Sequence, residues 1–131
     1  MLKLSPKALV VAAALAAVGS AEAATINYTA DSGWSRFSAG AVGTTVGRKF
    51  SFTLTKNAIL TVVDSFLVGD QFEVFANGSS LGATSVPGTG GTSTGMNFSA
   101  AAADGIHSVG RFILGPGSYV ISLDVLARSG T

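Results

Sequence analysis

The sequence predicts an all-β fold, a single antiparallel β-sandwich of the jelly-roll-like or Greek-key type that follows a signal-peptide helix. Only 11% of the 131 residues are charged while 17 are glycine, a balance that suits a small extracellular β domain better than a helical one. About seven short runs have strand character, with turn signals between them. The chain has no cysteine, so a packed core or self-association must stabilise it without disulfides.

The first 23 residues have the three parts of a secretory signal peptide. Lys3 and Lys7 form a short basic region, and the apolar run ALVVAAALAAV follows at 8–18. The small-x-small sequence at 21–23 matches a cleavage site, and the apolar run is too short to span a bilayer. We therefore expect a signal-peptide helix, detached from a β-sandwich domain at 24–131, and a secreted or cell-surface protein without membrane contact after cleavage. The alternative is an uncleaved anchor or a buried helix.

Charge is balanced in the domain that cleavage would leave. Residues 24–131 contain four arginines, two lysines and six acidic residues, so the net charge is 6 − 6 = 0. No basic surface is expected to follow a phosphate backbone. The composition therefore argues against a nucleic-acid partner.

The strands expected in the first half of this domain follow from residue type and alternation. One run alternates cleanly, with Phe50, Phe52 and Leu54 on one face, as in a half-buried antiparallel strand. The run after it is apolar on both faces, which is typical of a central strand. The expected strands are residues 25–29, 46–54 and 59–66.

The loop at residues 31–45 contains two large aromatic residues, Trp34 and Phe37. We expect both rings to lie under a sheet, because a small domain without disulfides needs its large aromatic residues buried. The alternative is that Trp34 is exposed and stacks on sugar rings.

The strongest turn signal in the chain is Asn77-Gly78. Both central positions of a type I′ turn need positive φ, which Asn and Gly tolerate best. A hairpin of residues 71–76 with 79–84 is therefore expected. Together with the turn at Gly69-Asp70, it is expected to set the register of one three-stranded unit that includes the preceding strand.

The end of the chain predicts a short helix and a second hairpin. Residues 99–104 are rich in alanine and suit one helical turn. The runs 109–114 and 118–126 flank a Gly-Pro-Gly turn, and the second run alternates, with Tyr119 and Ile121 on its apolar face. We therefore expect these two runs to pair with each other.

The stretch LTVVDSFLVGDQFEVFANGSSLGATSVPG (60–88) resembles a pattern in small exported bacterial proteins of the PEP-CTERM, exosortase-substrate type, and in similar secreted fungal proteins. The likeness extends over roughly residues 34–126. The matching positions are Asp64, Phe66, Gly69-Asp70, Phe72, Val74, Asn77-Gly78, Leu81-Gly82, Thr84-Ser85, Asp104, Ser108–Gly110 and Gly117–Tyr119.

This resemblance implies export and a surface or matrix setting, and it implies no reaction. The chain departs from the pattern in two ways. Ala76 stands where the pattern has Asp before Asn-Gly. The C-terminal sorting signal, a Val-Pro-Glu-Pro motif with a helix and a basic tail, is missing, so the chain is expected to be either a secreted member without sorting or a truncated one.

Asp64 and Asp70, with Glu73 close behind, are the candidate metal ligands. Asp64 ends a strand and Asp70 lies in the following turn, so both can face one loop. Calcium binds carboxylate and backbone oxygens, and a Gly-Asp turn offers both. The favoured interpretation is structural, because Asp commonly accepts backbone N–H bonds and stabilises turns.

No catalytic constellation is expected. Residues 91–95 (GTSTG) match the G-x-S-x-G elbow, but this elbow needs a strand before it and a helix after it. His107 is the only histidine, and Asp104 and Ser108 are its neighbours in sequence. One histidine does not make a zinc site without further ligands, so we expect a hydrogen-bonded loop residue and no enzyme.

Three functions remain open. The first is an exported, non-enzymatic structural or interaction protein of the cell surface or extracellular matrix, without a cofactor. The second is a carbohydrate-binding module for extracellular polysaccharide, assisted by calcium at Asp64 and Asp70. The third is a filament subunit that forms homo-oligomers by strand pairing, with residues 25–29 as the donor strand.

Overall fold

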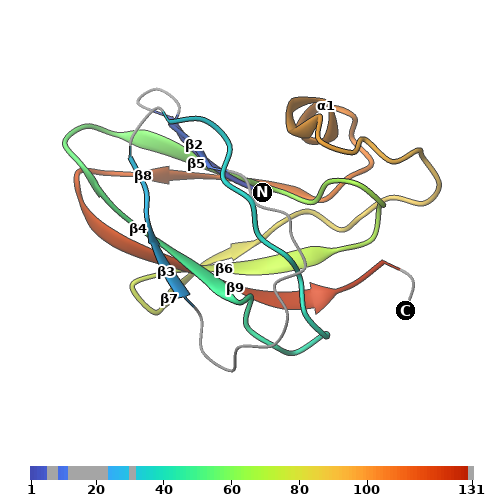
Figure 1. Ribbon diagram of the computed structural model, residues 1–131, viewed down its shortest axis with the longest axis horizontal. Helices are drawn as coiled ribbons and strands as arrows, with labels where there is room; N and C mark the ends of the chain where they lie inside the picture. Colours follow the sequence, from blue (N-terminus) through green and yellow to red (C-terminus); the bar gives the residue numbers. More distant parts are fainter. Residues whose placement is uncertain (6–8, 12–23, 30–31, 130–131) are drawn as a thin grey trace.

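The computed structural model describes residues 1–5, 9–11, 24–29 and 32–129, and it confirms that the protein is all-β. Strands form two sheets, with the orders β2-β1-β5-β8 and β3-β4-β9-β6-β7 (Figure 1). The elements are β1 (Leu2–Ser5), β2 (Leu9–Val11), β3 (Ala24–Asn27), β4 (Arg48–Leu54), β5 (Ala58–Val63), β6 (Gln71–Ala76), β7 (Ser79–Ala83), α1 (Phe98–Ala103), β8 (Val109–Leu114) and β9 (Gly117–Ala127).

The core lies between the two sheets and draws apolar side chains from both. The predicted face of β4 is confirmed, because Phe50, Phe52 and Leu54 are all buried. Phe37 packs edge-on against Phe50 and Phe72 under the five-stranded sheet, as expected. Trp34 differs, since it is only half-buried and packs edge-on against Phe98 of α1 in a smaller cluster. Large aromatic residues thus contribute much of the core of this cysteine-free chain.

The hairpin of β6 and β7 turns at Asn77-Gly78 as the sequence predicts. The φ angles are 50° at Asn77 and 82° at Gly78, so both central residues are left-handed. The Asn77 side chain also reaches β9, where its Oδ1 accepts from the Val120 N–H at 2.8 Å and its Nδ2 donates to the Ser118 carbonyl at 3.0 Å. One residue therefore makes the turn and joins the hairpin to the middle of its sheet.

The predicted hairpin between residues 109–114 and 118–126 is wrong. β8 pairs with β5, whereas β9 pairs with β4 and β6 in the other sheet. The Gly-Pro-Gly turn carries the chain from one sheet to the other, and Gly117 has a φ of 148°. Both strands keep their alternation because each faces the common core, so alternation alone does not reveal this crossing.

The predicted three-stranded unit is also wrong, for the same reason. β5 belongs to the four-stranded sheet, while the hairpin of β6 and β7 belongs to the five-stranded one. The turn at Gly69-Asp70 therefore connects the sheets rather than neighbouring strands. The expected helical turn is present as α1, where the Asn97 side chain accepts a hydrogen bond from the Ala100 N–H at 3.1 Å.

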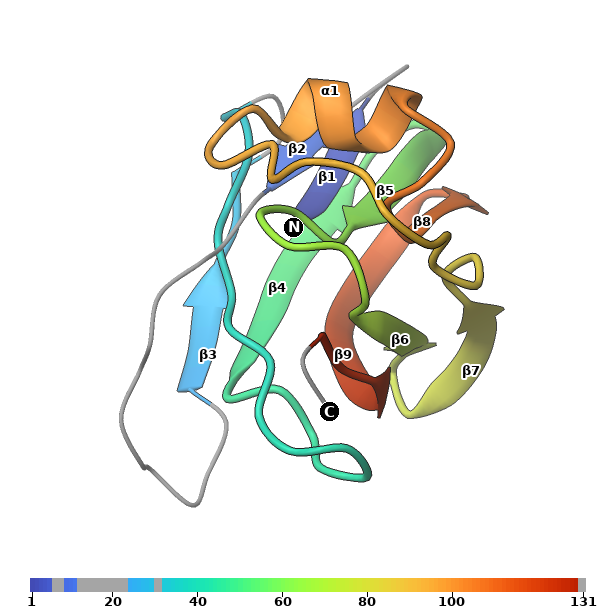
Figure 2. The same ribbon diagram turned by 90° about the vertical axis from the view of Figure 1, so that its right-hand side faces the viewer.

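The described part of the leader differs from the detached helix that we expected. Residues 2–5 and 9–11 are strands, and β1 lies antiparallel to β5 inside the four-stranded sheet. Figure 2 shows β1 between β2 and β5, with α1 over them. The edge of β5 offers unpaired backbone groups, which an extended segment satisfies. Residues 6–8 and 12–23 lie outside the described part, so the signal peptide and its cleavage stay predictions.

Among the described residues, no helix is long and apolar enough to cross a membrane.

Candidate functional site

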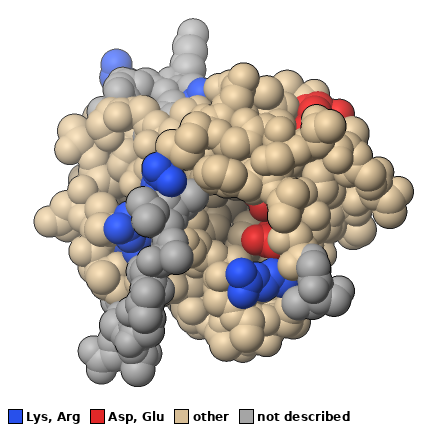
Figure 3. Space-filling view, turned by 45° about the vertical axis from the view of Figure 1, so that its right-hand side comes forward, with Lys and Arg blue, Asp and Glu red and all other residues tan. Residues whose placement is uncertain are grey.

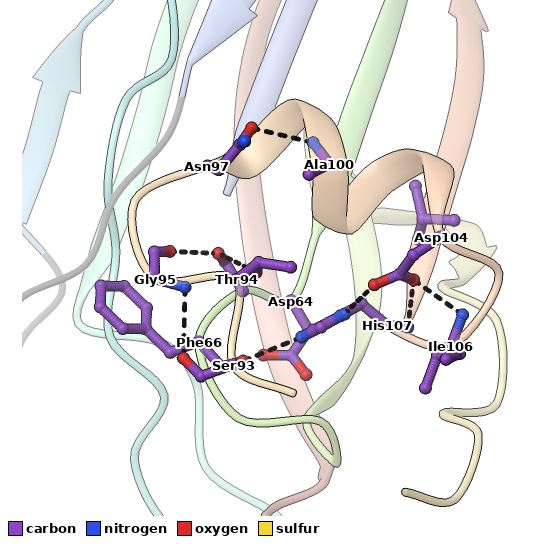
Figure 4. Close-up of polar contacts among 12 residues, drawn as sticks. Asp64, Phe66, Ser93, Thr94, Gly95, Asn97, Ala100, Asp104, Ile106 and His107 are labelled. Atoms are coloured by element: carbon purple, nitrogen blue, oxygen red, sulfur yellow. Dashed lines mark hydrogen bonds and ion pairs between the residues drawn. The ribbon is translucent and has the colours of Figure 1, made fainter. Parts of the chain in front are cut away.

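The candidate chemistry gathers at one place, which we call the loop junction: Asp64, Asp70, Asp104 and His107. Asp64 follows β5, Asp70 precedes β6, Asp104 follows α1 and His107 precedes β8. The fold brings four loop ends together here, and Figure 4 shows Asp104 bonded to His107 with Asp64 nearby. The sequence pointed to the first two residues as one pair and left the other two as sequence neighbours.

Asp64 closes the loop that crosses between the sheets. Its side chain is 4% exposed, and its Oδ2 accepts hydrogen bonds from the N–H groups of Gly69 and Asp70, each at 3.2 Å. Burial and, after it, the negative charge of Asp70 raise the pKa of Asp64 to about 7. The carboxyl is therefore held close to its titration point at neutral pH.

Asp70 ties down the other end of the same crossing. Its Oδ1 accepts from the Ser129 N–H at 2.7 Å, which fastens the chain beyond β9. Gly69 has a φ of 139°, and a Cβ at this position would lie 2.7 Å from the Ser129 Cα. Only glycine fits this close approach of two backbone segments.

The two carboxylates therefore hold backbone N–H groups, as the favoured interpretation expected. Glu73 points elsewhere, since its Oε1 accepts from the Ser80 hydroxyl on β7 at 3.0 Å. No cluster of three or more His, Cys, Asp or Glu residues with metal-site geometry occurs within the described ranges. Calcium binding by Asp64 and Asp70 stays a prediction.

His107 is the buried centre of the junction, with 2% of its surface exposed. Its Nε2 lies 2.9 Å from the Phe66 carbonyl and its Nδ1 lies 2.5 Å from the Asp104 carboxylate. Both partners are acceptors, so this geometry favours the ring that carries protons on both nitrogens. Burial lowers the pKa of His107, but the Phe66 carbonyl and the Asp104 carboxylate together outweigh it and raise that pKa.

Asp104 completes the pair and builds a turn. Its Oδ1 accepts from the N–H groups of Ile106 and His107, at 2.8 and 2.9 Å. Burial is the largest single influence and raises the pKa of Asp104, but these hydrogen bonds and the contact with the His107 ring together outweigh it and lower that pKa overall. The two ring nitrogens of His107 contact the Asp104 carboxylate and the Phe66 carbonyl and no serine hydroxyl, so the described contacts lack the serine–histidine bond of a triad.

Phe66 has a left-handed backbone conformation that directs its carbonyl into the loop junction. Its φ is 66°, an unusual left-handed conformation for a large aromatic residue. The conformation aims its carbonyl at His107, and the same carbonyl accepts from the Thr94 N–H at 3.3 Å. Ser93 lies in the neighbouring loop and only accepts from the Gly95 N–H at 3.2 Å, without a strand before it or a helix directly after it. The G-x-S-x-G match therefore has no elbow geometry.

A second polar link joins the sheets and was missed by sequence reasoning. The Ser108 hydroxyl donates to the Thr84 hydroxyl at 2.6 Å and also contacts the Ser85 carbonyl. The Thr84 hydroxyl in turn accepts from the Phe72 N–H at 3.0 Å. Both hydroxyl residues are buried and sit just outside strand ends, where a polar residue normally faces water. Their pairing depends on two segments 24 residues apart, which no local pattern shows.

The third feature is an open hollow of about 270 Å³ beneath α1, which we call the tryptophan hollow. Trp34 forms one wall, and the Lys3 ammonium lies 5.3 Å from the centre of its ring. The Arg111 guanidinium is anchored here by donating to the Ala102 carbonyl at 3.1 Å. The hollow is lined by Lys3, Trp34, Ile59, Thr61, Ser99, Ala102 and Arg111.

The surface around these features carries little charge. Figure 3 shows a mostly uncharged face, with acidic side chains in a hollow beside basic ones. The fold and the loop junction define a small all-β protein whose buried polar groups connect loops. Comparisons with protein-family models, with curated proteins and with solved structures find no match.

Proposed function

We propose that this chain is an exported, non-enzymatic structural or interaction protein of the cell surface or extracellular matrix, built as a β-sandwich of the jelly-roll-like or Greek-key type. One observation carries the proposal: the groups best suited to chemistry are occupied in holding the fold. Asp64, Asp70 and Asp104 accept backbone N–H bonds, and both nitrogens of His107 are engaged. Within the described residues these groups stabilise loops, which supports a structural or interaction role.

Export is supported by the leader pattern and by the resemblance to PEP-CTERM-type proteins. The low charge of the surface suits a protein that acts through packing and surface contacts. Because the chain has no cysteine, the exported domain is stabilised by its core and by the hydrogen bonds of the loop junction.

The test is to express the full chain with a C-terminal tag in a bacterial host and to fractionate the culture. We expect the tagged protein in the medium or on intact cells, accessible to added protease, with Ala24 as its first residue. The control is an Ala23→Leu variant, which disrupts the small-x-small site and should retain the leader. A chain that remains in the cytoplasm with Met1 in place would contradict the proposal.

A carbohydrate-binding module is the second candidate, and the tryptophan hollow favours it. An indole ring supplies a stacking surface for a sugar, and Thr61, Ser99 and Arg111 supply polar groups beside it. A glycan array tests this function with the Ala23→Leu chain, which keeps the Lys3 wall of the hollow, and with the processed protein. Binding that Trp34→Ala abolishes and Trp34→Phe largely keeps would support a sugar site, whereas no binding to any glycan would exclude it.

A further inference from the structure

The position of β5 has a consequence for the processed protein, and it rests on the proposed export. β5 lies between β1 and β8, so both of its edges are paired. The strand on one side, β1, belongs to the segment that cleavage after Ala23 would remove. Removal of this segment would leave an open edge and an open slot beside β5, which we call the β5 slot.

The β5 slot takes more than backbone hydrogen bonds from β1. Leu2 is fully buried in the main core opposite Val62, and Met1 is buried in the smaller cluster beside α1. Cleavage would remove the favourable burial of this leucine side chain. The slot therefore favours a strand with an apolar residue in the position of Leu2.

The leader fits the end of this slot poorly. The Met1 ammonium donates to the Val63 carbonyl at 2.7 Å in a buried position. Burial lowers the pKa of this amine well below its usual value of 8.0, although the charges of Asp64 and Asp70 oppose the shift. A peptide N–H makes the same hydrogen bond without a charge, so a strand that continues past this position suits the slot better.

Residues 24–29 have the pattern that the slot accepts. Ile26-Asn27-Tyr28-Thr29 alternates apolar and polar residues as Leu2-Lys3-Leu4-Ser5 does, and the Thr25 peptide N–H then takes the place of the Met1 ammonium. Cleavage also makes this segment the free end of the chain. In the present structure it forms β3, a mostly exposed four-residue edge strand parallel to β4, with Ile26 and Tyr28 packed against the core.

The β5 slot does not suit pairing with the open β5 edge of a second, intact domain. Figure 2 shows β3 and β4 of the five-stranded sheet extending beneath β1 and β2, beyond the edge of β5. A whole neighbouring domain paired to β5 would meet these strands, whereas a single terminal strand would not. The slot is therefore suited to strand donation.

We propose that residues 24–29 of a second copy fill the β5 slot, antiparallel to β5 and with Ile26 opposite Val62. A donor from the same chain would have to reverse direction within the four residues between Thr29 and Trp34, since the Trp34 ring already lies beside the slot at Lys3. A donor from another copy enters without this reversal. Because donor and acceptor are different surfaces, repeated donation links copies head to tail into open assemblies.

The test uses the processed protein, recovered after export, with cysteines at Thr29 and Ile59. The proposed register places these residues opposite each other, and the natural chain has no cysteine to interfere. We expect disulfide-linked dimers and longer species on a non-reducing gel. The matched control has cysteines at Thr29 and Thr53, which extend the β3–β4 register within one chain, and should give no such ladder.

A second pair of variants separates donation from general association. Ile26→Asp places a charge in the apolar position of the slot and should lower the yield of linked species more than about tenfold. Asn27→Lys should leave the ladder intact, because the Lys3 ammonium at the corresponding position lies over the Trp34 ring in the present structure. A monomer with an internal Thr29–Ile59 disulfide would contradict strand exchange between copies but not export. A processed chain without any ladder would do the same. A chain that keeps Met1 contradicts both export and exchange.

Discussion

Asp64 and His107 are both buried, yet their surroundings favour opposite charge states. The neutral form of Asp64 is favoured, and the charged form of His107 is favoured. Asp64 has no cationic partner in hydrogen-bonding contact, so burial and Asp70 favour its neutral form. His107 has a carboxylate and a carbonyl, so its charged form is favoured despite burial. In both groups the folded protein holds a proton more tightly than the unfolded chain does. Acid conditions therefore favour the folded state at this junction.

The first prediction concerns stability against pH. The contribution of Asp64 is fully present below its unfolded pKa of 3.8 and is lost as pH rises through about 7. His107 adds a loss in the same direction above 6.5. We expect the free energy of unfolding in urea to fall by about 1–4 kcal/mol between about pH 5 and about pH 8. Asp64→Asn keeps an acceptor for the two N–H groups and should remove most of this fall; an unchanged slope in the variant contradicts the assignment.

The second prediction concerns the ion pair between the buried His107 ring and the partly exposed Asp104 carboxylate. Asp104→Asn leaves a buried imidazolium without its counter-charge, so it should lower the free energy of unfolding by about 1–3 kcal/mol at neutral pH. Asp124→Asn is the matched control, because Asp124 makes an exposed hydrogen bond with the Thr45 hydroxyl. Equal losses in the free energy of unfolding would show that the ion pair with His107 stabilises the fold no more than the exposed hydrogen bond of Asp124 does. Because the pKa of Asp104 is lowered, its contribution is present above 3.8 and is lost as pH falls below that value.

The third prediction separates the structural and metal interpretations of Asp70. Asp70→Ala removes the acceptor for Ser129 and should lower stability by about 1 kcal/mol, while Asp70→Asn should retain most of it. Calcium at about 1 mM should leave the melting temperature of the natural protein unchanged. A calcium-induced rise in Tm that both variants abolish would establish a metal site instead.

At the scale of elements, turns set the arrangement of strands. The sequence correctly predicts the hairpin at Asn77-Gly78, because the two φ angles follow from local residue types. It does not reveal that the turns at Gly69-Asp70 and Gly115–Gly117 cross between sheets. In a two-sheet fold the strands on both sides of a crossing face one core, so their alternation looks the same as in a hairpin.

The fourth prediction concerns the β6–β7 turn. Asn77→Ala removes a residue that tolerates the left-handed conformation and two hydrogen bonds to β9. The free energy of unfolding should fall by about 1–3 kcal/mol. Asn57→Ala, in another turn and without positive φ, is the control and should change it by less than about 0.5 kcal/mol. Similar losses at both positions would mean that turn residues are sensitive in general.

At the scale of the whole molecule, the leader is both a predicted export signal and part of a sheet. The sequence identifies its basic region, apolar run and cleavage pattern, which are local properties. It does not show that Leu2 fits beside β5, since this depends on the open edge of a sheet formed by residues 58–63 and 109–114. The loop junction was predictable only in part for the same reason: Asp64 and Asp70 are close in sequence, but His107 meets Phe66 across 41 residues.

The fifth prediction compares chains with and without the leader. The Ala23→Leu chain, purified with its leader, should be monomeric by light scattering, because β1 fills the β5 slot. Leu2→Asp in that chain should lower the free energy of unfolding by about 2–4 kcal/mol, since it places a charge in the core. Lys3→Asp, at the half-buried neighbouring position, is the control and should have a smaller effect. If Leu2→Asp changes nothing, β1 is not a significant part of the folded precursor.

The central place of β9 governs the order in which this chain can fold. β9 is the last strand and pairs with β4 on one side and β6 on the other, so the five-stranded sheet has no middle until residues 117–127 are available. Contacts between such distant segments form slowly. In the order of synthesis, the five-stranded sheet therefore cannot be completed before residues 117–127 are available. A fragment that ends before β9 should be a substrate for proteases.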